Sequence, residues 1–131
     1  MSLQTLVLRD GADRRLRGGH LWIYSNEVDT KQSPLKNYTA GEQVVVVNSR
    51  GKDLGIAYVN PNTLICGRLI SRDTAHGLDR SLLVHRLNIA LSLREACFDA
   101  PCYRLVYGDS DGLPGLVIDR FMDTFVVQVS T

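Results

Sequence analysis

The first 75 residues of the chain alternate between apolar and polar positions in short stretches, which is the spacing of β-strands. Strands are expected at residues 4–9, 21–24, 42–48, 54–59 and 63–72, with a short helical turn at 12–17 that Gly18 and Gly19 end. Four consecutive valines within residues 42–48 favour a strand buried on both faces. Short strands in close succession with one helical turn predict a small mixed β-barrel.

The hydrophobic period changes near residue 79. From there to residue 98 the apolar side chains recur at three- and four-residue steps without Gly or Pro, which predicts a helix. Its buried face is expected to carry Leu83, Leu87, Ala90, Leu91, Arg94 and Cys97. Further strands are expected at residues 102–107, 116–120 and 124–130. We therefore predict one domain in residues 1–75 and the start of a second, α+β domain in residues 76–131.

The last expected strand places Phe125, Val127 and Val129 on one face and more polar residues on the other. A half-buried strand seldom ends a finished domain without a partner on each side. We therefore expect the second domain to be truncated, with its remainder beyond residue 131. The alternative is that this strand forms the edge of a complete, compact protein.

The composition excludes several classes of protein. Hydrophobic residues make up 44% of the 131 residues, which is enough for a buried core and excludes general disorder. No apolar run approaches the length of a membrane span, and no signal-peptide pattern opens the chain, so a cytoplasmic protein is expected. The net charge of +1 hides an asymmetry, because residues 1–75 carry ten Lys and Arg against seven acids. A basic first half points weakly to an anionic partner.

The three cysteines form neither a disulfide framework nor a zinc site, because their number is odd and no CxxC spacing occurs. Cys66 and Cys97 are expected to be small buried side chains. A nucleophilic cysteine needs a nearby base, and the spacing of the histidines assigns none.

The segment RRLRGGHLW, residues 14–22, combines three arginines, two glycines, a histidine and the only tryptophan. Cations at a rim suit phosphates, and glycine lets a nucleic-acid backbone approach closely. The alternative is a solvated turn. Trp22 offers a stacking face, but its apolar neighbours favour a core position. His20 is expected to be structural or to form hydrogen bonds at the barrel mouth, with RNA contact as the alternative.

The segment GDSDGLPGLVIDRF, residues 108–121, holds the carboxylates of Asp109, Asp111 and Asp119. Carboxylates can perform acid–base chemistry on a small molecule or hold a hard cation, but this spacing matches no calcium loop. The interpretation we favour is a rigid turn fixed by Pro114. Because no SAM-binding glycine loop, Walker motif or HExxH is present, we assign no catalytic, cofactor-binding or metal-binding residue to this chain.

Taken together, RRLRGGHLWIYSNEV and the following AGEQVVVVNSRGKDLGIAYVNPNTLICGRLIS resemble the N-terminal PUA domain of the bacterial 23S rRNA large-subunit methyltransferase I family. The shared pattern is a basic run, GHxW, an aromatic–Ser–Asn–Glu sequence, a Gly-Glu before a valine strand and an Asn-Pro turn. GDSDGLPGLVIDRF resembles the signature that opens the family's central domain. The chain departs from the pattern at Leu21 (usually proline), Asp109 (usually glutamate) and Phe121 (usually tyrosine).

The resemblance implies a PUA-like barrel followed by a linker helix and the first strands of an α+β domain. It implies an enzyme that uses S-adenosyl-L-methionine (SAM) to make 5-methylcytosine in 23S rRNA, with the SAM domain beyond residue 131 and this fragment inactive. It also implies homodimers. The RNA contacts it implies are Arg14, Arg15 and Arg17 on phosphates, Gly19 and His20 at the contact surface, and Arg68 as a further candidate. The alternatives are a stand-alone PUA module and the PUA domain of another RNA-modifying enzyme, such as a pseudouridine synthase.

Overall fold

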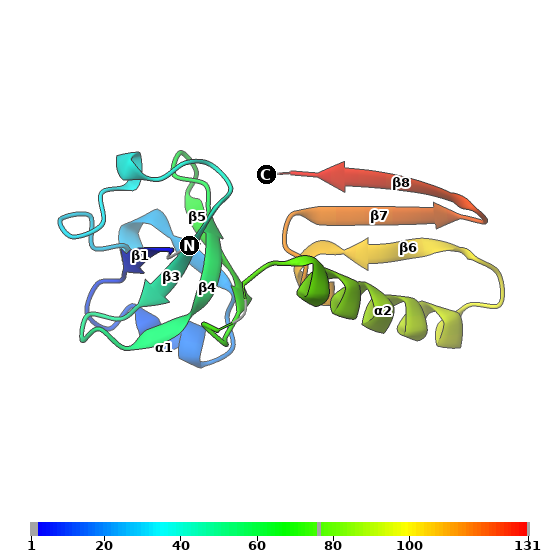
Figure 1. Cartoon of the computed structure of the whole chain (residues 1–131), viewed down its shortest axis with the longest axis horizontal. Coiled ribbons are helices and arrows are strands. Elements are labelled where there is room, and N and C mark those ends of the chain that lie inside the picture. Colours follow the sequence, from blue (N-terminus) through cyan, green and yellow to red (C-terminus); the bar gives the residue numbers. More distant parts are fainter. Residues whose placement is uncertain (1–2, 76, 131) are drawn as a thin grey trace. The chain divides into compact units, whose positions relative to one another are not determined.

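The computed structural model describes residues 3–75 and 77–130. The chain divides into two compact units, Met1–Leu78 and Asp79–Thr131, and each is described by itself (Figure 1). The domain boundary predicted between residues 75 and 76 involves residue 76, which lies outside the described residues.

The first unit is built on one five-stranded sheet. Its elements are β1 (Gln4–Val7), α1 (Asp13–Arg17), β2 (Trp22–Tyr24), β3 (Glu42–Val47), β4 (Asp53–Val59) and β5 (Ile65–Ser71). The strand order is β1-β3-β4-β5-β2. The β1–β3 pair is parallel and the other pairs are antiparallel. The expected strands and helical turn are therefore present, with ends that differ by one or two residues.

The two outer strands of this sheet, β1 and β2, are joined through the residues that follow each of them. An antiparallel bridge joins Leu8 to Val28. On either side of it, the Arg9 amide donates to the Glu27 carbonyl at 2.8 Å and the Asp29 amide donates to the Val7 carbonyl at 2.8 Å. These bonds close the sheet on itself, which satisfies backbone groups that an open edge would expose. The predicted small barrel with mixed strand directions is confirmed.

The barrel interior is filled by apolar side chains from every strand. Those no more than 2% exposed include Leu6, Leu8, Leu16, Ile23, Val28, Val44, Val46, Ala57, Val59, Cys66 and Leu69. Cys66 is buried as expected, and burial raises the pKa of its thiol to about 11, which suits a core side chain rather than a nucleophile. Val45 is only half-buried, so burial on both faces is incomplete in β3.

The second unit packs one helix on a three-stranded antiparallel sheet. Its elements are α2 (Arg80–Cys97), β6 (Cys102–Tyr107), a 3-10 turn η3 (Gly108–Asp111), β7 (Leu116–Phe121) and β8 (Thr124–Val129). Asp79 caps α2 by accepting a hydrogen bond from the Leu82 amide at 2.8 Å. The helix contributes Ala90 to the core, flanked by Leu83, Leu87 and Leu91. The helix followed by strands is the mixed β/α fold expected for this half.

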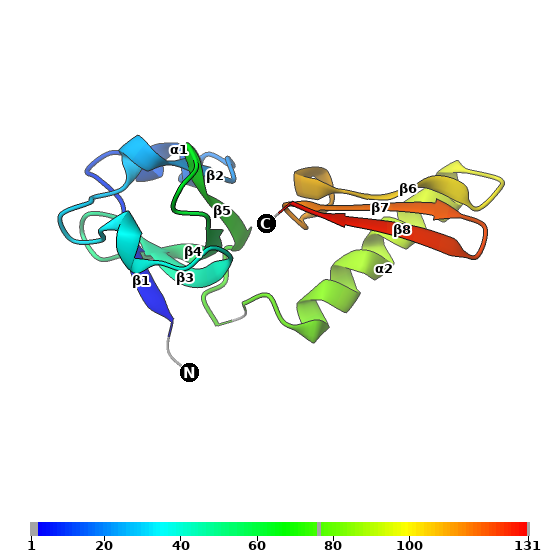
Figure 2. The same ribbon diagram turned by 90° about the horizontal axis from the view of Figure 1, so that it is seen from above.

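Two expectations about the second unit were wrong. Cys97, placed on the buried face of α2, is exposed because it lies in the last turn of the helix. The strand β8 was expected to be half-buried but is exposed along its whole length. The exposed fraction is 51% for Phe125 and 63% for Val129. The helix lies beside β6 and away from β8 (Figures 1 and 2), so it does not cover the apolar side chains of that strand.

In the parts of the chain that the structure describes, no helix is both long and apolar enough to cross a lipid bilayer.

Gly55 marks the tightest backbone approach in the barrel. Its φ of +153° is rare for residues with side chains, and a Cβ there would collide with the Ser71 carbonyl oxygen of β5 and lie 3.0 Å from Leu69 Cδ1. Gly51, in the turn between β3 and β4, has a φ of +83° but would place a Cβ in open space. Substituting each glycine in turn therefore distinguishes the cost of a strained backbone conformation from the added cost of a collision in the sheet.

Replacing Gly55 with Ala is expected to lower the free energy of unfolding of the first unit by about 2–5 kcal/mol, because strain and overpacking add. The matched variant Gly51→Ala is expected to cost about 1 kcal/mol, from backbone conformation alone. Urea unfolding followed by the fluorescence of Trp22, the only tryptophan, reports on this unit. Equal losses of unfolding free energy for the two variants would contradict the close approach of β5 to Gly55.

Candidate nucleic-acid interface

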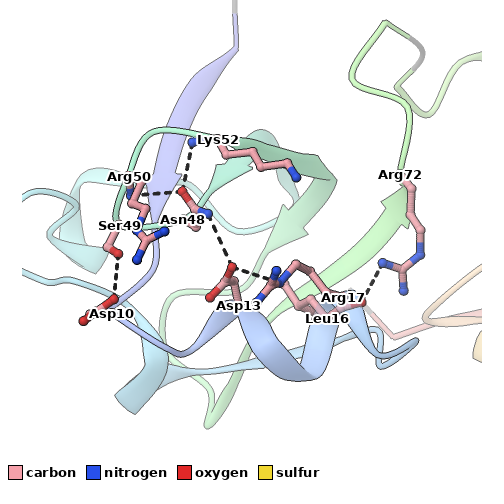
Figure 3. Close-up of polar contacts among 9 residues, drawn as sticks. All are labelled: Asp10, Asp13, Leu16, Arg17, Asn48, Ser49, Arg50, Lys52 and Arg72. Atoms are coloured by element: carbon pink, nitrogen blue, oxygen red, sulfur yellow. Dashed lines mark hydrogen bonds and ion pairs between the residues drawn. The ribbon is translucent and has the colours of Figure 1, made fainter.

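The helix α1 is pinned to the turn between β3 and β4 by a chain of polar contacts (Figure 3). The buried Asp13 carboxylate accepts from Arg17 Nε at 3.2 Å and from Asn48 Nδ2 at 3.4 Å. The side-chain oxygen of Asn48 accepts from the backbone amides of Arg50 at 3.0 Å and Lys52 at 2.9 Å. Because one asparagine fixes the turn and also contacts the helix, the turn that carries Arg50 and Lys52 is joined directly to α1.

Arg72 holds the other end of α1. Its guanidinium donates to the carbonyl oxygen of Leu16 at 2.6 Å (Figure 3). It also donates to the carbonyl oxygen of His20 at 3.3 Å. A cation on the last carbonyls of a helix is favourable because these groups carry the negative end of the helix dipole. The helix has only five residues, so these tertiary contacts, rather than its own hydrogen bonds, keep it formed.

The three arginines of α1 have different environments. Arg15 pairs with Glu27 at 3.2 Å and lies 4.9 Å from the centre of the Tyr24 ring, so it is held by internal partners. Arg17 pairs with Asp13, yet its side chain stays 59% exposed. Arg14 is exposed, and nothing in residues 3–75 or 77–130 forms a hydrogen bond or ion pair with its guanidinium. Arg14 and Arg17 are thus the α1 cations best placed to meet an external anion.

The two glycines after α1 leave the backbone accessible. Gly18 closes the helix, its amide lying 3.1 Å from the carbonyls of both Arg14 and Arg15. Gly19 has a φ of +109° and has open space where a Cβ would lie. His20 follows on the exposed surface. This stretch therefore has an exposed backbone between the helix and β2, with no Cβ at Gly19. Close approach of a nucleic-acid backbone to it stays a prediction.

Trp22 is not a core residue, contrary to the expectation from its apolar neighbours. It is 37% exposed, whereas Ile23 is 1% exposed and points into the barrel. Leu21 also packs against the core, so the two neighbours that favoured burial face inward and Trp22 faces outward. Its cross-strand partner is Arg68 of β5, whose guanidinium carbon lies 5.2 Å from the centre of the indole ring.

Sequence reasoning missed three residues of this surface. Arg50, Lys52 and Arg72 were part of the positive charge of the first half, but none of them was a candidate RNA contact. The structure brings them to α1 through Asn48 and through the carbonyls at the end of the helix. The only available signal was the SRGKD turn, which places two cations on a hairpin tip without indicating what lies beside it.

Comparison with known proteins identifies the family. The family described as "PUA-like domain" matches residues 6–72. The chain belongs to the PUA-like domain family.

Relatives of the PUA-like chain extend the match into the second unit. It is 33% identical over 128 residues to Ribosomal RNA large subunit methyltransferase I of Aliivibrio fischeri (strain MJ11), covering 95% of the chain and 32% of that protein. It is 36% identical over 127 residues to the protein of the same name from Erwinia tasmaniensis, covering 95% and 31%. The resemblance predicted from the motifs is confirmed. The chain spans about a third of the length of these relatives.

Solved structures share the fold. A chain from Streptococcus mutans described as a SAM-dependent methyltransferase superposes with a TM-score of 0.80 at 19% identity, covering 98% of the PUA-like chain and 33% of that chain. A methyltransferase solved in complex with SAH superposes with a TM-score of 0.80 at 20% identity, covering 98% and 33%. At this identity the likeness concerns the fold alone.

The carboxylates of the second unit stabilise its turn. Asp111 accepts two hydrogen bonds from Arg94 of α2, at 2.8 and 2.9 Å, and a third from the Tyr107 amide at 2.7 Å. Asp119 pairs with Arg104 at 2.8 Å, which lowers the pKa of that carboxyl and raises the pKa of the guanidinium. Within the described ranges, no group of three or more potential ligands converges on a metal position. These contacts support the architectural interpretation of residues 108–121.

Replacing Asp111 with Asn is expected to destabilise the second unit by about 2–4 kcal/mol, because it leaves the largely buried Arg94 guanidinium without its bidentate partner. The matched variant Asp119→Asn breaks a more exposed pair and should cost less. Amide hydrogen exchange in β6 and β7 measures both losses. A rise in melting temperature on adding Mg²⁺ or Ca²⁺, abolished by Asp111→Asn, would instead indicate a cation site.

Proposed function

We propose that the PUA-like unit binds ribosomal RNA and positions it for methyl transfer performed by a part of the parent protein outside this chain. The observation that carries this proposal is the contact of Asp13 with Asn48, which joins the cations of α1 to those of the β3–β4 turn. Four exposed cations from two distant parts of the sequence, Arg14, Arg17, Arg50 and Lys52, thereby share one surface. Such a surface favours a polyanion with regularly spaced phosphates over a single small anion.

The arginines of this unit would have different roles in RNA binding. Arg14 and Arg17 would contact phosphates, since the Arg17 side chain is 59% exposed and its planar fork keeps donors available while Nε stays paired with the buried Asp13 carboxylate. Arg15, held by Glu27 and Tyr24, would orient α1 and make at most an additional contact. Gly19 and His20 would line the approach of the RNA backbone. Arg68 would act beside Trp22.

The second unit would form the linker helix and the first strands of the following domain, with the boundary near residue 76. SAM would be the methyl donor, as the names of the structural neighbours suggest. The described residues do not fit it: the glycine-rich loop 108–115 leads through the 3-10 turn η3 into β7 and presents no helix N-terminus to an anionic or adenosine-bearing ligand. We therefore assign SAM binding and catalysis to the parent protein beyond this chain.

The finer expectations follow from the relatives. Their name specifies the RNA of the large ribosomal subunit, so we propose 23S rRNA as the partner. We also propose cytosine C5 as the methylated position, which is what the sequence resemblance implies. A homodimer remains a prediction of the sequence resemblance, and a cytoplasmic location remains a prediction from the signal-peptide and membrane-span patterns of the sequence.

The double variant Arg14→Ala with Arg17→Ala is expected to weaken binding to a 23S rRNA fragment and to reduce the slope of log affinity against log salt by about one unit per lost phosphate contact. Adding Arg50→Ala and Lys52→Ala should reduce the slope further. The matched control is Lys31→Ala with Lys36→Ala, in the segment on the other side of the barrel from α1 (Figure 1). Titrations at several salt concentrations give the slopes. An unchanged slope and affinity would contradict the assignment.

The parent protein is expected to transfer labelled methyl groups from SAM to cytosine in 23S rRNA, whereas this chain alone should transfer none. In the parent protein, the Arg14 and Arg17 substitutions should raise KM for RNA more than they lower kcat, because they remove binding rather than chemistry. Base analysis of the product RNA identifies the modified nucleotide. Methyl transfer by the chain alone, or pseudouridine in place of methylcytosine, would contradict the proposal.

A further inference from the structure

The outer face of β2 carries two aromatic side chains, each paired with an arginine. The Arg68 guanidinium lies over the Trp22 ring, at 5.2 Å from guanidinium carbon to ring centre, and the Arg15 guanidinium lies over the Tyr24 ring at 4.9 Å. Ile23, between the two aromatic residues, points into the barrel. The strand therefore separates an interior that holds the core from an exterior that presents rings and guanidinium groups.

The side chain of Trp22 is not part of the barrel core. The buried cluster includes Ile23 from β2 but not Trp22, which keeps 37% of its surface exposed. Next to the other end of β2, Leu64 is 68% exposed, and its carbonyl accepts a hydrogen bond from the Ser25 amide at 2.8 Å. The exposed part of Trp22 thus presents apolar surface next to the Arg68 cation, a composition that suits a partner with both aromatic and anionic groups.

This face is rigidly connected to the cationic surface of α1. Arg15 belongs to α1 and contacts Tyr24 of β2, while Glu27 accepts hydrogen bonds from both Arg15 and the Tyr24 amide. The Leu69 amide of β5 donates to the Leu21 carbonyl at 2.7 Å, directly before Trp22. The position of the indole ring relative to the phosphate-contacting arginines is therefore fixed by the fold.

We propose that Trp22, together with Arg68, forms a stacking platform for an unpaired base of the bound RNA. This inference rests on the proposed RNA-binding function and adds the form of RNA that is recognised. Paired bases in a helix already stack on their neighbours, whereas an unpaired base in a loop or bulge exposes a π-face that an indole can cover. Because the Arg68 guanidinium lies over the ring, the base would stack on the exposed surface of this ring–guanidinium pair, and Arg68 would supply donors for the edge or phosphate of the same nucleotide.

The single tryptophan makes a direct test available. The chain is titrated with a short single-stranded oligoadenylate, with the same oligonucleotide carrying abasic residues, and with a fully paired duplex of equal length. We expect the oligoadenylate alone to quench the Trp22 fluorescence strongly. Trp22→Ala should lower its affinity about 5- to 100-fold, measured by anisotropy of labelled RNA, while the salt slope set by Arg14 and Arg17 stays unchanged.

Two further variants separate stacking from folding. Trp22→Phe keeps an aromatic face and should retain most of the affinity, whereas Trp22→Leu keeps apolar bulk without a π-face and should behave like Trp22→Ala. Thermal unfolding followed by circular dichroism shows whether each variant is folded. Because Leu and Phe both fill the position, a difference in affinity between two folded variants reports on stacking.

The outcomes distinguish the two proposals. RNA binding with a normal salt slope, without quenching and with equal affinity for Trp22→Ala, overturns the platform and leaves the RNA-binding function standing. An absence of RNA binding even at low salt overturns both. If Trp22→Ala instead abolishes a concentration-dependent self-association seen by sedimentation, the face is a protein contact and the platform is overturned.

Discussion

Closure of the barrel between the ends of β1 and β2 is the constraint on which the remaining structure depends. These strands are the outermost in the sheet, and the Leu8–Val28 bridge with its flanking hydrogen bonds brings them together. Once they are adjacent, the connection between them needs only to cross one end of the barrel. The five-residue helix α1 does this and inserts Leu16, 2% exposed, into the core. Asp13 is also buried, so the side of α1 that faces solvent is carried by its three arginines.

Electrostatics explains how so many cations are tolerated on a short helix. Asp13 is buried and accepts from both Arg17 and Asn48, and Glu27 holds Arg15 against Tyr24. The salt bridges that these two acids form hold the helix in place, but they neutralise only part of its positive charge. A partly satisfied arginine keeps donors available in its planar fork, so the same side chain can orient the helix and bind a phosphate. The acidic partners therefore position the cations rather than cancel the surface.

The strands, the long helix and the family could be predicted because they depend on local patterns: alternation, three- and four-residue spacing, and motifs such as RRLRGGHLW. Features that depend on tertiary contacts could not. Trp22 has apolar neighbours, but the strand turns them inward and the ring outward. Arg50 and Lys52 join α1 only through Asn48, whose partner is 35 residues away. Cys97 followed the helical pattern but lies in the last turn, where it is exposed.

Phosphate contacts and base contacts make different contributions to recognition. The cations of α1 and of the β3–β4 turn can supply affinity for any RNA, because every nucleotide carries the same charge. Discrimination among folded RNAs needs a feature that varies along the chain, and an unpaired base is one such feature. A rigid barrel that binds phosphates at one place and an unpaired base at another favours RNAs in which the two are separated by a matching distance. Such a unit would select RNA by shape and leave the choice of the modified base to the domain that performs the reaction.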